Sequence, residues 1–575
     1  MSPRQVPTAR RSQLVTTYGV GALFPAQNES FMVMGLEEWA DAGLGPQILE
    51  ARLARSLRVS AFHAPAAGSD RGRDVPVIRF PEYQFCPECR RLAPIWEFGG
   101  WNEHVCKECD TDLVPSRFVV CCPRGHIDDF PYHAWLHGSN AGIGSPDHRL
   151  RLHALGRSSS LSDIRVSCSC ETTPMSLEGA FAAEALRDVR SCSGRRPWLG
   201  ADSRESCTEV PRTLQRGSSN VWFPVVASAI SIPPWSEGVY RLLDRHWSVL
   251  AAIPPDAVRA TLSGMALPAH QYTLDELTDA VLRRRGEAPG EEDDDLRLGE
   301  YKALVAGRPE GKDKQDFVCE PTTVPPSLTD HVIQVSRVSR LREIRALRGF
   351  TRILPRTHET PDEHVAPLTR DGSFWLPAIE VTGEGVFLRL DGDRLATWEN
   401  GEFARGRADL LQRTVDQRAA DRGLAQQPLV AARDLLLHSL AHALVEQLSL
   451  DAGYPSASLR ERVFSDGDMA GVLVYTATSD SGGSLGGVAA QSEEGRMQQA
   501  VLGAMARLSW CSSDPVCIES VGSGADALNL AACHACLLVP ETSCERNNTF
   551  LDRATLVGTP EKPEAGFFSA LLSRV

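Results

Sequence analysis

Twelve of the sixteen cysteines in this chain fall into three groups of four, and this grouping constrains the fold more than any other sequence feature. Two cysteines held two residues apart can bind a metal ion from one tight turn, and a second pair completes a tetrahedral zinc site. The sequence therefore predicts a metal-stapled scaffold that holds about two to three zinc ions. The groups are Cys86, Cys89, Cys106 and Cys109; Cys168, Cys170, Cys192 and Cys207; and Cys517, Cys533, Cys536 and Cys544.

The three groups differ in how well their spacing defines a site. The segment Cys86–Cys109 holds two matched CxxC pairs, as in a zinc ribbon, and the second pair argues against a redox CxxC. In the last group, Cys511 lies six residues before Cys517 and competes with the others as a ligand. The middle group is looser. The segment Cys121–His126, with two cysteines and a histidine, is a competing set that packed thiols beside a turn also explain.

Length and charge limit the possible functions. A chain of 575 residues predicts three or four domains, and 42% hydrophobic residues supply ordinary globular cores. The net charge of −14 excludes a protein that binds nucleic acid over its whole surface, so any DNA contact needs a local patch or a partner. We find no signal-peptide pattern and no apolar run of about eighteen residues, so we expect no membrane span. Thiols kept reduced for metal predict a cytoplasmic protein.

Composition and periodicity predict an α+β multidomain fold. In the last part, a helix over 429–448, a strand over 471–475 and a helix over 493–508 indicate a mixed α/β domain. Residues 379–390 predict a β-hairpin with its turn at 382–385. The expected parts are an N-terminal domain (1–80), a cysteine-rich region with a zinc ribbon (81–215), a helical segment (216–286), a flexible acidic linker (287–316), a basic helix plus β-hairpin domain (317–424) and a C-terminal domain (425–575).

The expected C-terminal helix carries His438, His442 and Glu446 on one face, each one turn from the next. This arrangement resembles a metal or acid–base constellation, but it lacks the HExxH order of zinc proteases, so a core or interface pair is favoured. The glycine-rich run 480–487 follows a strand but lacks the lysine of a Walker loop, which leaves a phosphate-contacting loop and a plain turn as alternatives. With Asp480, the three helix residues define an alternative function, a metal-dependent nuclease or hydrolase.

Arginines recur between residues 337 and 356, and Val338, Leu341, Ile344 and Leu347 are interleaved with them. This pattern predicts a helix with one apolar face and an arginine-rich remainder. In an acidic protein it is the best candidate for contacts with DNA phosphates, and a solvated helix paired with acidic neighbours is the alternative. The candidate DNA-binding residues are Arg337, Arg340, Arg345, Arg348 and Arg352.

Short motifs along the chain resemble known families. The C-terminal part contains His438-Ser-Leu-Ala-His442, Asp514-Pro-Val-Cys517, Cys533-His-Ala-Cys536 and Cys544, and it resembles the MrfA-type zinc-binding domain (MZB), which accompanies DNA helicases. Further upstream stand Arg11-Ser-Gln-Leu14, Gly125-His-Ile-Asp128, Arg196-Pro-Trp-Leu-Gly200 and Gly349-Phe-Thr-Arg352. Together these motifs resemble the DrmB family of the DISARM antiphage system over nearly the whole chain.

The resemblance implies a non-catalytic subunit that acts in defence against phage. Its partner would be a DrmA-like helicase, which supplies the ATPase motors whose Walker motifs this chain lacks, and its ligand would be DNA. The resemblance also implies that the four C-terminal cysteines are zinc ligands, with residues 425–575 as the MrfA-like domain. Two alternatives remain, the nuclease described above and a purely structural scaffold.

Overall fold

The computed structural model describes residues 8–26, 28–67, 74–101, 104–138, 148–154, 160–170, 172–233, 235–244, 246–265, 272–285, 295–310, 316–356, 360–421, 428–476, 486–524 and 527–572. The fold is α+β and multidomain, as the sequence predicts, and it consists of two compact units. The first unit comprises Met1–Ile48, Arg58–Ala227 and Arg345–Ile379, and the second comprises Leu49–Leu57, Ser228–Ile344 and Glu380–Val575. Within the residues described, no helix combines the length and the apolar character needed to cross a membrane.

The first unit is built mainly from short antiparallel strands. Its strands are β1 (Leu23–Ala26), β2 (Glu29–Val33), β3 (Gln47–Ile48), β4 (Ala61–His63), β5 (Val77–Arg79), β6 (Tyr83–Phe85), β7 (Arg91–Pro94), β8 (Val105–Cys106), β9 (Thr111–Asp112), β10 (Val114–Pro115), β11 (Phe118–Cys121), β12 (Ile127–Asp129), β13 (Leu150–Ala154), β14 (Ile164–Cys168), β15 (Met175–Ser176) and β16 (Arg212–Gln215). Its helices are α1 (Gln13–Thr16), α2 (Leu36–Ala42) and α4 (Tyr132–His137).

Two sheets of the first unit carry the cysteines. One has the strand order β10-β6-β7-β13-β14-β15, and the other has the order β12-β11-β16. Between them lies an aromatic and aliphatic core that includes Phe118, Phe130, Tyr132 and Val166, all at most 1% exposed. The strands are short, so the connecting loops are long relative to the core, and metal sites are a physically reasonable way to fasten such loops.

The second unit places helices around the strands of a mainly antiparallel sheet. Its helices are α3 (Ala51–Leu57), α5 (Gly238–Asp244), α6 (Trp247–Leu250), α7 (Val258–Gly264), α8 (Leu274–Arg284), α9 (Leu296–Ala306), α10 (Gly392–Glu399), α11 (Glu402–Asp421), α12 (Ala432–Ala452), α13 (Glu494–Leu508), α14 (Ala554–Val557) and α15 (Ser569–Leu572). Its strands include β18 (Val318–Thr322), β21 (Leu459–Phe464) and β22 (Gly471–Thr476). Three strands contain residues of both units: β17 (Phe223–Ile230), β19 (Val332–Thr351) and β20 (Trp375–Leu390).

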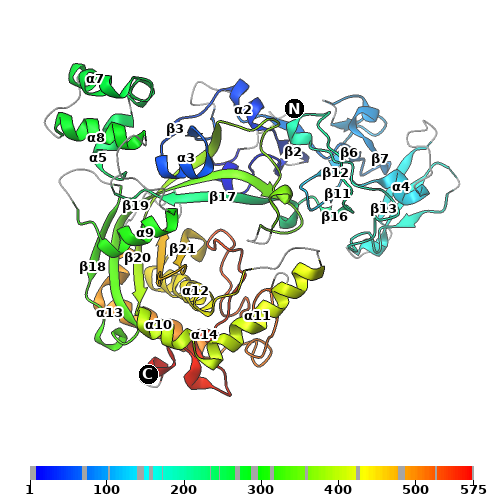
Figure 1. The fold of residues 1–575 in the computed structure, drawn as a ribbon. Helices are drawn as coiled ribbons and strands as arrows, with labels where there is room; N and C mark the ends of the chain where they lie inside the picture. The colour runs from blue at the N-terminus through cyan, green and yellow to red at the C-terminus, as the bar shows by residue number, and fades with distance from the viewer. Residues whose placement is uncertain are drawn as a thin grey trace. The chain divides into compact units, whose positions relative to one another are not determined.

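Helix α12 is the centre of the second unit. Residues 435–445 are all buried, because α12 packs against β21, β22, α13, α14 and α11 (Figure 1). A helix that is apolar on every side must be enclosed in this way. The predicted helix over 429–448, strand over 471–475 and helix over 493–508 correspond to α12, β22 and α13. His438 and His442 therefore lie inside the protein and not on its surface.

The basic helix expected from residue 337 onward is wrong: this segment is the 20-residue strand β19. Its apolar residues recur every third position, from Val332 to Phe350. On a strand, residues three apart point to opposite faces, so this period supplies apolar side chains to both faces. Residues 341–347 are accordingly all buried. Two-sided burial stabilises a strand here, and the β-branched residues Val332, Val335 and Ile344 favour it as well.

Two other expectations are also corrected. The predicted hairpin turn at 382–385 lies inside the continuous strand β20, where Gly385 pairs with Tyr475 of β22. A Cβ atom on Gly385 would come within 2.4 Å of the Val474 carbonyl oxygen, so glycine there allows close strand approach and not a turn. The expected flexible linker 287–316 contains α9, whose Glu300 is fully buried and bonds Arg462 at 2.6 Å. Residues 291–294 of the acidic run lie outside the described residues.

Candidate metal centres

Five groups of four side chains bring their potential ligand atoms within 4.8 Å of one another. The described residues place three groups in the first unit and two in the second. Around a tetrahedral zinc ion, two sulfur ligands lie about 3.8 Å apart, as follows from Zn–S bonds of about 2.3 Å. The groups are the Cys86 site (Cys86, Cys89, Cys106, Cys109), the Cys122 site (Cys122, His126, Cys192, Cys207), the Cys168 site (His137, His148, Cys168, Cys170), the Cys511 site (Cys511, Cys517, Cys533, Cys536) and the His438 site (His438, His442, Glu461, Cys544).

The Cys86 site has two matching turns. The Arg90 amide donates to the Cys86 carbonyl at 3.0 Å, and the Asp110 amide donates to the Cys106 carbonyl at 2.8 Å. Both Arg90 and Asp110 have positive φ, at 65° and 54°, so each chain bends back directly after its CxxC pair. The Cys89 and Cys106 sulfurs are 3.8 Å apart, the separation that a tetrahedral zinc requires. The structure thus brings together the four cysteines grouped from their spacing.

The middle group does not form one site. Cys192 and Cys207 lie with Cys122 and His126, whereas Cys168 and Cys170 lie with His137 and His148. The reason is topological. β14, which ends at Cys168, belongs to the sheet with β13 and β15, whereas Cys122 and His126 lie in the connection between β11 and β12 of the other sheet. Each pair of cysteines is therefore completed by histidine from its own neighbourhood. The expected single site becomes two mixed Cys/His sites.

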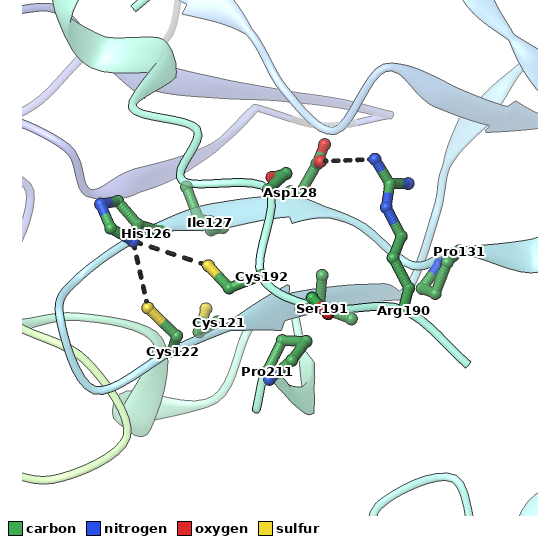
Figure 2. A pocket seen from close by; sticks show the side chains of 12 residues that line it. Cys121, Cys122, His126, Ile127, Asp128, Pro131, Arg190, Ser191, Cys192 and Pro211 are labelled. Carbon is green, nitrogen blue, oxygen red and sulfur yellow. Dashed lines mark hydrogen bonds and ion pairs between the residues drawn. The ribbon is translucent and has the colours of Figure 1, made fainter. Parts of the chain in front are cut away.

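The Cys122 site is organised around one histidine ring (Figure 2). Nδ1 of His126 lies 3.3 Å from the Cys122 sulfur and 3.5 Å from the Cys192 sulfur, and Cys207 lies 4.0 Å from Cys122. The other ring nitrogen lies 2.8 Å from Glu205. A carboxylate on the outer nitrogen fixes the orientation of a metal-bound histidine. The Cys122 thiol and His126 lower the pKa of Cys192 to about 4, which favours the thiolate that a metal needs.

Cys121 is not part of this group. Cys121 and Cys122 follow one another at the end of β11, so their side chains point to opposite sides. Burial raises the pKa of Cys121 to about 12, which makes it an inert thiol in the core. Of the three candidates in the competing set Cys121–His126, Cys122 and His126 therefore belong to the site and Cys121 does not. The segment Cys122-Pro-Arg-Gly-His126 was the sequence feature that indicated this pair of ligands. Its glycine, Gly125, has φ 81° and turns the histidine back toward the cysteine.

The Cys168 site contains two histidines, His137 and His148, that our sequence analysis did not identify. Nδ1 of His148 lies 3.4 Å from the Cys168 sulfur. Nδ1 of His137, at the end of α4, lies 3.2 Å from the Thr172 hydroxyl, and its Nε2 is buried without a hydrogen-bond partner among the described residues. The Thr172 hydroxyl lowers the pKa of Cys170 to about 7. One ring nitrogen of each histidine lies within 4.8 Å of the two sulfurs.

The Cys511 site corrects the last quartet, because Cys511 takes the position that we assigned to Cys544. Cys511 and Cys533 sulfurs lie 3.5 Å apart, and Cys536 lies 3.7 Å from both Cys517 and Cys533. The Cys536 thiol, followed by the weaker influence of the Cys533 thiol and Arg553, lowers the pKa of Cys517 to about 6 against the effect of burial. Cys511 lies three residues after the last residue of α13, Leu508, so this site fastens the following loops close to the end of that helix.

The His438 site includes only two of the three helix residues that we grouped from the sequence. His438 and His442 do lie together, but their companions are Glu461 of β21 and Cys544. Glu446 is one-third exposed and lies 3.6 Å from Arg507. Asp480 lies outside the described residues. Both histidines are 0% exposed, so a substrate has no access to them, and the geometry does not support a nuclease centre built on these residues.

The five candidate DNA-binding arginines differ sharply in exposure. Arg337 is exposed, and the side chains of Arg340 and Arg348 are 31% and 34% exposed. Arg345 and Arg352 are buried at 6% and 1%. The Arg352 guanidinium donates to the carbonyl oxygens of residues 125, 221 and 21, at 2.8, 2.6 and 2.9 Å. Arg345 and Arg352 are therefore structural residues in this chain and not surface contacts.

Comparison with known proteins identifies the family. Residues 10–223 match a domain of unknown function (DUF8724), and residues 440–537 match the MrfA Zn-binding domain. Over 571 residues the chain is 31% identical to the DISARM protein DrmB of Bacillus paralicheniformis, and the match covers 95% of this chain and 99% of that protein. The chain belongs to the DrmB family. The resemblance inferred from the short motifs is thereby confirmed.

The two matched segments of this DrmB-family chain contain most of the ligand groups. The DUF8724 segment holds the Cys86, Cys122 and Cys168 sites, and the MrfA-type segment holds all four cysteines of the Cys511 site. His438 and Cys544 lie outside the MrfA-type segment. Zinc is the metal for which that domain is named, and the thiol and imidazole groups collected here are the ligands that zinc prefers. All sixteen cysteines are free of disulfides.

Proposed function

We propose that this DrmB-family chain is a non-catalytic, zinc-stabilised subunit of a DISARM antiphage complex, and that it binds a DrmA-like helicase and, together with it, DNA. Membership of the DrmB family over 95% of the chain carries the proposal. The chain itself offers no Walker motif for ATP hydrolysis, so the motor must come from a partner. Reduced thiols gathered for metal fit a cytoplasmic setting.

The ligand groups support a scaffolding role for the metal. Each group joins different loops or element ends, and some of these lie far apart in sequence, such as Cys122 with Cys207. With four protein ligands a tetrahedral zinc ion has no open position, so zinc in these sites would hold structure and not activate water. We propose zinc for the Cys86, Cys122, Cys168 and Cys511 sites on this basis.

We propose that the exposed and partly exposed arginines of β19 contact the DNA. Arg337 and Arg340 lie on β19 beside β18, and the Arg340 guanidinium lies 3.8 Å from the exposed Glu310. An ion pair this long and this exposed is weak, so phosphate can replace the carboxylate at little cost. Arg348, 3.7 Å from the exposed Asp362, is a third candidate. Guanidinium groups bind phosphate through two parallel hydrogen bonds, which suits them to a DNA backbone.

The test uses the full chain mixed with its helicase subunit. We expect a stable complex whose DNA affinity falls steeply between about 50 and 200 mM salt, because bound phosphates release counterions. The double variant Arg337→Gln/Arg340→Gln is expected to weaken DNA binding by the complex and to reduce the salt slope by about two. Arg259→Gln is the matched control, because this exposed arginine lies on α7 and pairs with the exposed Asp275.

Each result decides one part of the proposal. If the two proteins do not associate, the helicase partnership is wrong. If they associate but the double variant and the control bind DNA equally well with the same salt slope, the arginine contact is wrong and the chain is a scaffold. Fluorescence anisotropy with labelled duplex and single-stranded DNA gives both affinity and slope.

A further inference from the structure

We propose that His438, His442, Glu461 and Cys544 bind a structural zinc ion inside the second unit. This site goes beyond the matched MrfA Zn-binding segment, which ends at residue 537 and begins at residue 440, and so includes only His442 and Glu461 of the four. It also does not depend on the proposed role in defence.

Both imidazole rings are held by their outer nitrogen. Nδ1 of His442 lies 2.8 Å from the Leu537 carbonyl oxygen, and Nδ1 of His438 lies 3.3 Å from the Phe550 carbonyl oxygen. A carbonyl oxygen only accepts, so each Nδ1 carries a proton. In a neutral imidazole, each Nε2 is then a bare lone pair that points to the centre of the site. This is the tautomer of a histidine that binds metal through Nε2.

The centre of the site lacks the donors that these lone pairs need. His438 Nε2 lies 3.0 Å from Glu461 Oε1 and 3.3 Å from the Cys544 sulfur, and His442 Nε2 lies 3.3 Å from Glu461 Oε2. Within the described structure, His442 Nε2 and Glu461 Oε2 are buried with no hydrogen-bond partner. Buried polar atoms without a hydrogen-bond partner destabilise a fold, and this favours a bound ion at the centre. A divalent cation satisfies all four atoms at once.

Two backbone amides are directed at the Cys544 sulfur. The Arg546 and Asn548 amides both donate to its sulfur at 3.3 Å. Asn547 and Asn548 have positive φ, at 52° and 57°, which curls the chain around the sulfur. The turn therefore resembles the returns after the CxxC pairs of the Cys86 site. A Cys544 thiolate formed on metal binding and the Glu461 carboxylate would together carry two negative charges, which a divalent ion balances.

The donor set selects zinc, and the burial selects a structural role. Two nitrogens, one sulfur and one carboxylate oxygen are ligands for zinc, whereas calcium and magnesium prefer oxygen alone. The four residues are at most 5% exposed, so no position is open to water or substrate. The ion would join α12, β21 and the loop at Cys544. His442 also bonds Leu537, which directly follows the Cys536 ligand of the Cys511 site, so the two sites brace the same loop.

The direct test needs no variant. Crystals of the full chain measured above and below the zinc absorption edge are expected to show an anomalous peak among the four side chains, as well as one in the Cys511 site. A peak in the Cys511 site and none here would overturn the proposal.

Metal content in solution is the second test. We expect Cys544→Ser and His442→Ala each to lose one zinc per chain relative to the unmodified protein. Cys319→Ser is the matched control, because Cys319 is also fully buried but belongs to none of the five groups. An unchanged metal content in folded Cys544→Ser protein contradicts the proposal. If that variant does not fold, cobalt substitution of the unmodified chain decides: one of its sites must show charge-transfer absorption from a single thiolate.

Discussion

Replacing Arg352 with methionine tests whether this arginine stabilises the fold or contacts DNA. The substitution removes three hydrogen bonds to buried carbonyl oxygens. At about 1–3 kcal/mol for each unsatisfied group, the loss is about 6 kcal/mol at the middle of the range. Burial of the cation has a cost that the variant avoids: it lowers the pKa of Arg352 from 12.5 to about 10, which corresponds to about 3 kcal/mol. We expect a net destabilisation of about 3 kcal/mol.

Thermal unfolding and amide hydrogen exchange measure this effect. For a unit of this size, about 3 kcal/mol lowers the melting temperature by roughly 6–12 °C. Exchange is expected to rise first around Gly125, because Arg352 holds the loop that carries His126. Arg348→Met is the matched control. Arg348 is one-third exposed and lies 3.7 Å from the exposed Asp362, so its loss is expected to change stability by less than about 0.5 kcal/mol.

One pattern of results would refute the reasoning. If Arg352→Met melts with the unmodified chain, shows the same exchange near Gly125 and yet lowers the salt slope of DNA binding by the complex, then Arg352 reaches phosphate. The structural interpretation of its three hydrogen bonds would then be wrong.

Three further predictions follow from buried contacts. Arg462→Met leaves Glu300 unpaired at 0% exposure and is expected to destabilise the chain by about 3–5 kcal/mol, and the added change Glu300→Gln should restore part of this in urea unfolding. Gly385→Ala places a methyl group 2.4 Å from the Val474 oxygen and should lower the melting temperature, whereas Gly392→Ala, with nothing within 4 Å, should not. Removal of metal with a chelator is expected to increase proteolysis at the loops of the five sites, and a colorimetric indicator follows the release of zinc. An unchanged rate of proteolysis after metal removal would contradict the scaffold role.

Local patterns predicted local structure well. The sequence predicted α12, β22 and α13 because the apolar pattern of each element depends on residues that are close together in sequence. The prediction of a helix at β19 was wrong because an apolar residue at every third position is compatible with a helix or a strand. Burial on both faces selects the strand, and this burial is a property of the whole fold. The prediction of a hairpin turn within β20 was wrong for a related reason. Gly383 and Gly385 are typical of a turn, but here they permit close approach to β22.

The same distinction explains which metal ligands were found. Every one of the five groups contains a pair two to four residues apart: Cys86 with Cys89, Cys122 with His126, Cys168 with Cys170, Cys533 with Cys536, and His438 with His442. Such a pair is a local chelate that its own turn or helix arranges, so it can be recognised in the sequence. The remaining ligands come from other elements.

The Cys86 site contains the same four cysteines that sequence spacing groups, because both of its halves are local pairs within 24 residues. In the other four sites the second half is set by sheet order and loop paths. Cys511 and Cys544 illustrate this. Cys544 lies only 8 residues after Cys536 and Cys511 lies 22 residues before Cys533, yet the fold places Cys511 with that pair and Cys544 with the histidines of α12. A long loop closed by metal removes more entropy from the unfolded chain than a short one. The ligands that sequence spacing could not assign are therefore the ones expected to contribute most to stability, which the metal contents of Cys511→Ser and Cys544→Ser, each set against its melting temperature, would establish separately for the two sites.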